Sequence, residues 1–249
     1  MKTHQRIYID NQWDQPLKQD SSIQLITVFG NRHTISDDAI RQDIMQHYPN
    51  ADIIGCSTAG EISGTEIYDS SLCLTAMSFH SSTVAIATTS VTDTSLDAAI
   101  SRLLQQMPTL NLQYVMVLSD GQHVNGTQLV KGLKENLPND VLITGGLAGD
   151  DTRFEETVVW HNNDISSGKI LLCGFYGNDL IIGHGSQGGW DSFGPTRIVT
   201  QSTNNVLQEL DNKSALELYK EYLGDHAKDL PASALLFPLL VTLQGEKDA

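Results

Sequence analysis

Cysteine and basic residues are both scarce in this sequence of 249 residues. The three cysteines are an odd number without a Cys-x-x-Cys pair, which is typical of reduced thiols and argues against a disulfide framework or a thiolate zinc site. Fifteen Lys and Arg stand against thirty Asp and Glu, so the formal net charge is −15. A surface this acidic repels polyanions, and we therefore exclude DNA and RNA as partners.

Long apolar runs are also missing. The longest, Ala234–Val241, is too short to span a bilayer and contains Pro238, and the opening residues lack the apolar core of a signal peptide. These absences predict a cytoplasmic protein without a membrane partner. The sequence also lacks a catalytic-triad signature, a nucleotide-binding glycine fingerprint and the spacing of metal ligands. We therefore expect neither an enzyme nor a bound metal.

The sequence does contain an internal duplication. Matching Pro49 to Pro138 gives a shift of 138 − 49 = 89 residues, at which acidic Glu61 falls on acidic Asp150 without a gap. Each copy has an apolar strand, a helix with apolar residues four apart, a second strand and a loop rich in small residues. Two equivalent loops predict one binding site between them.

The first copy covers about residues 23–92. Its expected elements are a strand, a helix capped by Ser36 that ends before Pro49, a second strand and two runs rich in Thr, Val and Ile, at residues 23–29, 36–48, 52–55, 72–79 and 84–91. Because only four residues separate the last two runs, they predict an antiparallel hairpin.

The second copy covers about residues 112–187. Its hairpin is expected at 169–176 and 180–185, joined by the turn residues Gly177-Asn178-Asp179. A helix at about 95–107 links the copies, with Thr94 and Asp97 at the spacing of a capping box.

The pattern therefore predicts an α/β (mixed α+β) fold built from two strand-helix-strand-hairpin units, with mixed sheets and the helices outside. Two facing sheets would give four layers, and one continuous mixed sheet is the alternative.

The two ends of the chain depart from the repeat. Residues 1–22 are expected to form an arm with a short strand at Ile7–Ile9. Beyond the second copy we expect strands at 196–200 and 206–210, a helix from Ser214 to its C-cap Gly224, and a final strand at 235–243.

Six ordered blocks of this sequence are similar to one known family. They are GCSTAGEI at 55–62, LSDG at 118–121, GGLAGDD at 145–151, GWDSFGP at 189–195, the pair Val199-Thr200, and NNVLQELDNKSALELYKEYLG at 204–224. Together they resemble the FIST N-terminal sensory domain, over about residues 23–230. Asn212 and Ser214 depart from the Gly and Pro usual in the family, at a helix entry.

The resemblance implies an intracellular sensory domain that binds a small ligand such as an amino acid. Its partners would be a histidine kinase, a chemoreceptor or a cyclic-di-GMP signalling protein, and some relatives are described as haem-binding nitric oxide sensors. Family members usually continue into a FIST C-terminal domain, so residues 231–249 are expected to be the start of one, truncated here.

The candidate ligand-binding residues lie around the duplicated loops. They are Gly55, Cys56, Ser57, Ala59, Gly60 and Glu61; Asp120 and Gly121; Gly145, Gly146, Ala148, Gly149, Asp150, Asp151 and Arg153; and Trp190. Small residues allow close approach to a ligand and expose backbone N–H groups, the acids would hold an ammonium group, and Arg153 would hold a carboxylate. Alternatively, the small residues only make tight turns, the acids cap loops, and Trp190 is a gate, a contact to a further domain or a packing residue.

Two alternatives concern single side chains. Cys56 follows a strand and would be the nucleophile of an enzyme, although a buried, inert cysteine is the commoner state. Haem, the alternative cofactor, would need an axial ligand such as His184 or His123, while the absence of Cys-x-x-Cys-His excludes the usual covalent attachment. A histidine among apolar residues is more often simply hydrogen-bonded.

Overall fold

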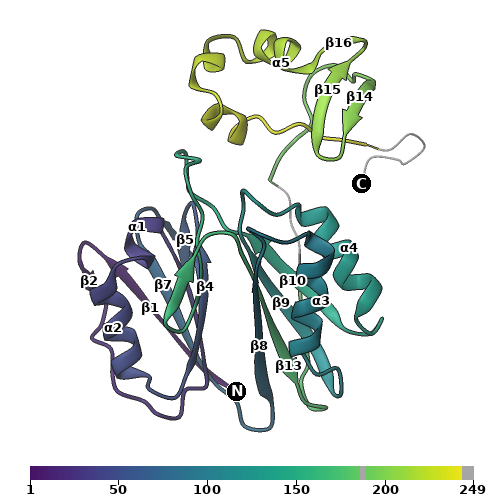
Figure 1. Ribbon diagram of the computed structural model, residues 1–249. Coiled ribbons are helices and arrows are strands. Elements are labelled where there is room, and N and C mark those ends of the chain that lie inside the picture. The colour runs from purple at the N-terminus through teal and green to yellow at the C-terminus, as the bar shows by residue number, and fades with distance from the viewer. Residues whose placement is uncertain (186–188, 243–249) are drawn as a thin grey trace. The chain divides into compact units, whose positions relative to one another are not determined.

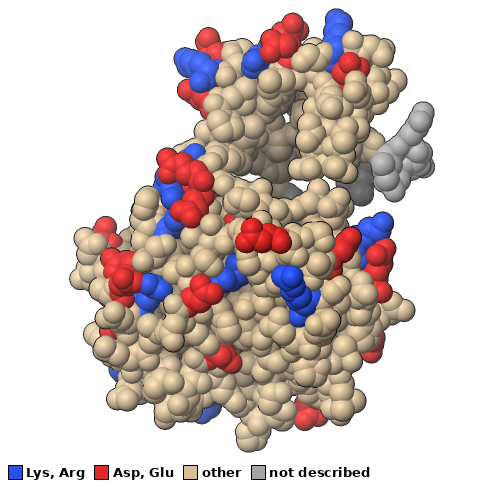
Figure 2. Space-filling model, viewed as in Figure 1, with Lys and Arg blue, Asp and Glu red and all other residues tan. Residues whose placement is uncertain are grey.

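The computed structural model describes residues 1–185 and 189–242 and divides the chain into two compact units, Met1–Gly183 and His184–Ala249 (Figure 1). The division falls inside the predicted domain of residues 23–230. No helix in the described ranges is long and apolar enough to cross a membrane. Figure 2 shows acidic and basic side chains interspersed over the visible face.

The larger sheet of the first unit has seven strands in the order β12-β11-β4-β3-β7-β1-β2. Their bounds are β1 Lys2–Ile9, β2 Gln12–Trp13, β3 Leu25–Gly30, β4 Asp52–Ser57, β7 Leu72–Ser78, β11 Val159–His161 and β12 Asp164–Ser166. β3 and β4 are parallel, and β7 runs antiparallel to both β3 and β1. Part of the predicted N-terminal arm is therefore an integral strand, since β1 pairs with β7 over seven residue pairs from Lys2 to Tyr8.

The second sheet has four strands in the order β10-β9-β13-β8. Their bounds are β8 Thr83–Ser90, β9 Leu112–Ser119, β10 Leu142–Leu147 and β13 Lys169–Tyr176. β9 and β10 are parallel, as β3 and β4 are in the first sheet. The second parallel strand of each copy, β4 or β10, thus ends at the small-residue loop that the sequence singles out.

Helices cover the outer face of each sheet, as Figure 1 shows. Their bounds are α1 Arg32–Ile35, α2 Asp38–His47, α3 Leu96–Gln106 and α4 Gly126–Asn136. One apolar cluster lies between α2 and the first sheet, and another lies between α3, α4 and the second sheet. A third cluster, which includes Ile54, Val159, Leu171 and Phe175, fills the space between the two sheets. The order helix, sheet, sheet, helix confirms the four-layered alternative, and the single continuous sheet is wrong.

The helix starts differ from the prediction by one residue. Asp37, not Ser36, caps α2, because its carboxylate accepts hydrogen bonds from the N–H groups of Ala39 and Ile40. Ser95, not Thr94, caps α3. Ser, Thr and Asp can all serve as the N-cap, so adjacent residues of these types do not show which of them begins the helix.

Both predicted hairpins are wrong. β7 lies in the first sheet, whereas β8 crosses to the second sheet and pairs with β13. Residues 180–185 form no strand. Facing sheets are only about 10 Å apart, so a link of four residues is long enough to reach the other sheet. The length of the link therefore does not distinguish a hairpin from a crossing between sheets.

A short hairpin follows β4, with β5 at Glu61–Ser63 and β6 at Glu66–Tyr68. The corresponding hairpin of the second copy, β11 and β12, leaves its own sheet and pairs with β4 of the first. Each copy therefore contributes strands to the sheet of the other.

The second unit is a three-stranded sheet with a helix and two short helical turns. Their bounds are β14 Val199–Thr203, β15 Val206–Leu210, β16 Lys213–Ser214, α5 Ala215–Leu223, η1 Gly224–Asp229 and η2 Ala232–Leu235. Ser214 caps α5 and Gly224 ends it with a φ of 55°, as predicted. The strand predicted at 196–200 lies three residues later. The strand predicted at 235–243 is wrong for 235–242, since Leu235 ends η2 and residues 236–242 form no strand. Residues 243–249, the last part of the predicted domain start at 231–249, lie outside the described residues.

Candidate functional site

The loops of the two copies are in direct contact. We call residues 57–60 and 147–150 the paired loops. The N–H of Gly149 donates to the carbonyl oxygen of Ser57 at 2.8 Å. A Cβ placed on Gly149 would meet the nitrogen of Ala59 at 3.4 Å, so the two backbones nearly touch. The predicted meeting of the duplicated loops therefore exists in the fold.

Several glycines at this end of the sheets are required by packing. A Cβ on Gly55 would lie 2.1 Å from the carbonyl oxygen of Val28, and one on Gly145 would lie 2.0 Å from that of Val117. The two contacts are alike, although Gly145 lies one residue beyond the position that the 89-residue shift gives for Gly55. A Cβ on Gly121 would lie 2.1 Å from the carbonyl oxygen of Ala148. Gly146 differs, because no atom of the described residues other than its two chain neighbours lies within 4 Å of its added Cβ.

Asp120 follows β9 and is completely buried. Its Oδ1 accepts from the N–H groups of Gln122 and His123 and contacts the His123 ring at 3.0 Å, while its Oδ2 accepts from Thr157 Oγ1 at 3.0 Å and from the N–H of Gly168 at 2.9 Å. Burial alone would raise the pKa of Asp120, but these hydrogen bonds outweigh it and hold the pKa below its ordinary value. Asp120 thus anchors three separate loops.

Asp150, in the loop after β10, is also a buried carboxylate held by several hydrogen bonds. Burial would raise the pKa of its carboxyl, but the backbone N–H groups of Glu156 and Glu155 and the side chains of Arg153 and Arg32 lower it. Arg32 Nε lies 2.8 Å and Arg153 Nε 3.1 Å from Asp150 Oδ1. Arg32 belongs to the first copy, so this ion pair links the two copies.

Glu61, the counterpart of Asp150, is also buried. It accepts hydrogen bonds from the hydroxyl of Thr58 and from the N–H and hydroxyl of Ser71. Three of the four carboxylates predicted to converge on a ligand are therefore buried and have protein partners, as in the loop-capping alternative, whereas the side chain of the fourth, Asp151, is 46% exposed.

Acidification is expected to destabilise the first unit through Asp120 and Asp150. Because their pKa values lie below the ordinary value, both carboxylates stabilise the fold above the ordinary pKa and lose that contribution as the pH falls through the folded pKa. Urea unfolding should show a stability that falls between about pH 5 and pH 2. The variant carrying Asp120→Asn and Asp150→Asn should have a flatter profile, and an equally steep one would contradict this assignment.

Cys56 and Ser57 close the end of β4. Burial raises the pKa of the Cys56 thiol to about 12, which disfavours the thiolate that a nucleophile needs. Ser57 is fully buried, and its hydroxyl accepts from the N–H of Val158. Ala59 and Gly60 remain partly or fully exposed, as do Gly145 and Gly146.

Among the described residues, neither candidate haem ligand faces the apolar cavity that haem requires. The side chain of His123 is 53% exposed, with its Nδ1 against Asp120. His184 is exposed and belongs to the second unit, as does Trp190. The surroundings of these histidines, as far as they are described, do not fit haem. Within residues 1–185 and 189–242, no three His, Cys, Asp or Glu side chains gather as metal ligands.

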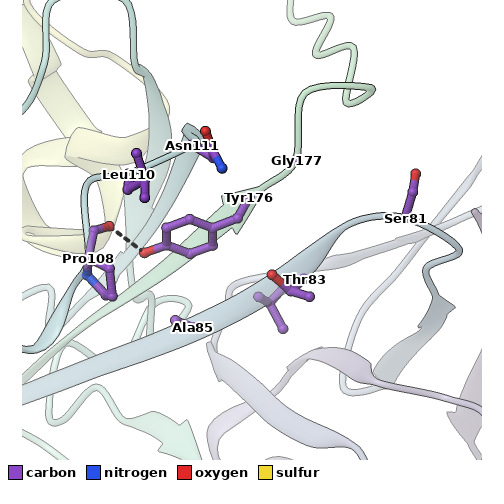
Figure 3. Close-up of a pocket in the computed structure, with 9 residues that line it drawn as sticks. Ser81, Thr83, Ala85, Pro108, Leu110, Asn111, Tyr176 and Gly177 are labelled. Carbon is purple, nitrogen blue, oxygen red and sulfur yellow. Dashed lines mark hydrogen bonds between the residues drawn. The ribbon is translucent and has the colours of Figure 1, made fainter.

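None of the described residues that line the hollow in Figure 3 belongs to the paired loops. It has a volume of about 400 Å³, and the Tyr176 ring points across it to donate its hydroxyl to the carbonyl of Pro108 at 2.9 Å. Its other walls include Thr83, Ala85 and Asn111. The hollow lies at the amino end of β9, whose eight residues separate it from the paired loops by about 25 Å.

The sequence reading missed the partners of the buried acids. Arg32, Thr58, Ser71, Thr157 and Gly168 all bond to a predicted carboxylate. The internal duplication could have pointed to the loop that carries Arg32. The 89-residue shift places Asn31 on Asp120, and both side chains accept a hydrogen bond from the N–H two residues ahead.

Comparisons with known proteins bear on this arrangement. A family model described as the FIST N domain matches residues 24–213. An uncharacterized protein of Methanocaldococcus jannaschii is 26% identical over 200 residues, which cover 74% of this chain and 37% of that protein. The chain thus spans little more than a third of the length of this relative. Because the family model matches well over half of the chain, the protein belongs to the FIST family of sensory domains through its FIST N domain.

Proposed function

We propose that this FIST domain is a cytoplasmic sensor that binds a small ligand bearing a carboxylate, of the size of an amino acid, at the paired loops. The direct contact between the loops carries this proposal, because it brings the two copies together at one place. Crossover loops at the carboxyl ends of parallel strands are common positions for ligands.

Arg153 supports the carboxylate as the recognised group. Its Nη2 is buried and has no hydrogen-bond partner among the described residues, whereas its Nε is held by Asp150. A buried donor without a partner is unfavourable, so a ligand carboxylate that reaches it would gain a charge-assisted hydrogen bond. Since Glu61, Asp120 and Asp150 already have partners, the ammonium group of an amino acid would find Asp151, whose side chain is 46% exposed and 3.8 Å from Arg153 Nη1.

The ion pairs around Asp150 provide a route for a signal. Arg153 and Arg32 share Oδ1 of Asp150, and Arg32 also contacts Glu155 and Glu156. A ligand that draws Arg153 away from Asp150 changes the contacts between the two copies and favours one conformer over another. A further domain, a histidine kinase or a cyclic-di-GMP signalling protein would respond to that shift.

The test is a thermal-shift screen of amino acids followed by calorimetry. We expect one of them to raise the melting temperature, and Arg153→Gln to weaken its binding by about tenfold or more. Arg102→Gln, an exposed position on α3, removes the same charge and should bind normally. The proposal fails if no amino acid binds, or if both variants bind as the unaltered protein does.

A haem-based nitric oxide sensor stays a prediction. An absorption spectrum with added haemin tests it through the Soret band, and replacing His123 or His184 would remove that band. We continue to expect no enzymatic activity, and the raised pKa of the Cys56 thiol supports that expectation.

A further inference from the structure

A second hollow lies between the β1–β2 hairpin and α2, in a region that the proposed function does not use. It has a volume of about 560 Å³ and belongs wholly to the first unit. The hairpin turns at Asp10-Asn11, both with positive φ, which places Tyr8 directly opposite Trp13. On α2, Ile40 and Asp43 face the hollow from positions three apart.

The aromatic walls are held in a fixed arrangement. The rings of Tyr8 and Trp13 have centroids 5.3 Å apart and an interplanar angle of 72°, so they present two nearly perpendicular surfaces. The indole N–H of Trp13 donates to Asp43 Oδ2 at 2.8 Å. That hydrogen bond fixes both the Trp13 ring and the carboxylate relative to the hollow.

The charge of the residues that line the hollow is negative. Asp43 is the single charged residue among the described residues that line the hollow, and the others are apolar or neutral. Its second oxygen, Oδ1, lies 3.2 Å from the ring of His47, whose Nδ1 is also 2.8 Å from the Asp43 carbonyl oxygen. The whole chain carries a net charge of −15, so cations are attracted and anions repelled.

We propose that this hollow binds a small ammonium cation, with a methylated or quaternary amine as the ligand class. Aromatic faces attract a cation through the negative charge over the ring, and bulky, weakly hydrated ammonium groups lose little on leaving water. Asp43 supplies the opposite charge at the wall of the hollow. A neutral ligand of the same shape would gain only apolar contact.

Calorimetry with choline and with its neutral carbon isostere, 3,3-dimethylbutan-1-ol, tests the proposal on the full chain. Choline should bind and the alcohol should not, and Trp13 fluorescence should change on binding. Asp43→Asn should weaken choline binding about fivefold or more, and Trp13→Leu should weaken it similarly. Asp38→Asn removes the same charge from the same helix outside the hollow and should leave binding unchanged.

Several outcomes would overturn the proposal. These are an absence of choline binding, equal binding of choline and the alcohol, or equal effects of Asp43→Asn and Asp38→Asn. Sedimentation with phosphatidylcholine vesicles, in the absence of free choline binding, would instead indicate a lipid headgroup surface. Melting temperatures of the variants identify any that do not fold, and for these the choline and alcohol comparison on the unaltered protein decides. Amino-acid binding through Arg153 is measured separately, so failure at one site does not imply failure at the other.

Discussion

Replacing Asp120 with alanine is expected to lower the free energy of unfolding of the first unit by about 3–5 kcal/mol. The carboxylate is completely buried and accepts from Gln122, His123, Thr157 and Gly168. Removing it leaves the buried donors of Thr157 and Gly168 without a partner, which costs more than the loss of an exposed hydrogen bond. Urea unfolding followed by circular dichroism measures the change.

Two further variants make the Asp120 result specific. Asp120→Asn keeps the size of the side chain and one acceptor oxygen, so it should cost less than alanine. Asp140→Ala changes an exposed aspartate and should shift the stability by no more than about 0.5 kcal/mol. If Asp120→Ala cost no more than Asp140→Ala, Asp120 would not be the anchor of the surrounding loops and a ligand role would regain support.

The second large effect is expected at Gly145. In Gly145→Ala the added Cβ would lie 2.0 Å from the carbonyl oxygen of Val117, and the residue has a φ of 151°, which side chains rarely adopt. Because the obstacle is backbone of the neighbouring strand, the parallel pair β9–β10 must separate. We expect a loss of about 4 kcal/mol or more, or a chain that does not fold.

The neighbouring residue is the matched control for Gly145. Gly146→Ala places its Cβ in open space, so its stability should change by less than about 1 kcal/mol. Soluble yield and melting temperature of the two variants give the comparison even if Gly145→Ala does not fold. Similar behaviour of both would show that the close approach of β9 and β10 does not require glycine.

Local patterns in the sequence predicted the strand-helix-strand part of each copy. Apolar periodicity, Pro49 and Pro138 are properties of short segments, and the parallel pairs β3–β4 and β9–β10 follow from them. The meeting of the paired loops was also predictable, because it rests on the 89-residue correspondence.

The roles of the buried acids could not be predicted in the same way. The hydroxyl of Thr157 and the N–H of Gly168 that bond to Asp120 are 37 and 48 residues away in the sequence. An acidic residue after a strand has the same local pattern whether its partners come from the protein or from a ligand. The choice depends on distant contacts, as does the choice of β13 as the neighbour of β8.

The exchange of strands between the copies bears on how the chain folds. β4 pairs with β11, where Gly55 stands opposite Trp160, and β8 pairs with β13, where Ala87 stands opposite Leu172. Neither copy can complete its own sheet, so a chain cut between them leaves strand edges open on both fragments. These contacts join residues that are distant in the sequence. The entropy cost of closing the intervening loop comes before the strands can pair, and this slows folding. The first unit should therefore unfold as one cooperative body rather than as two successive halves.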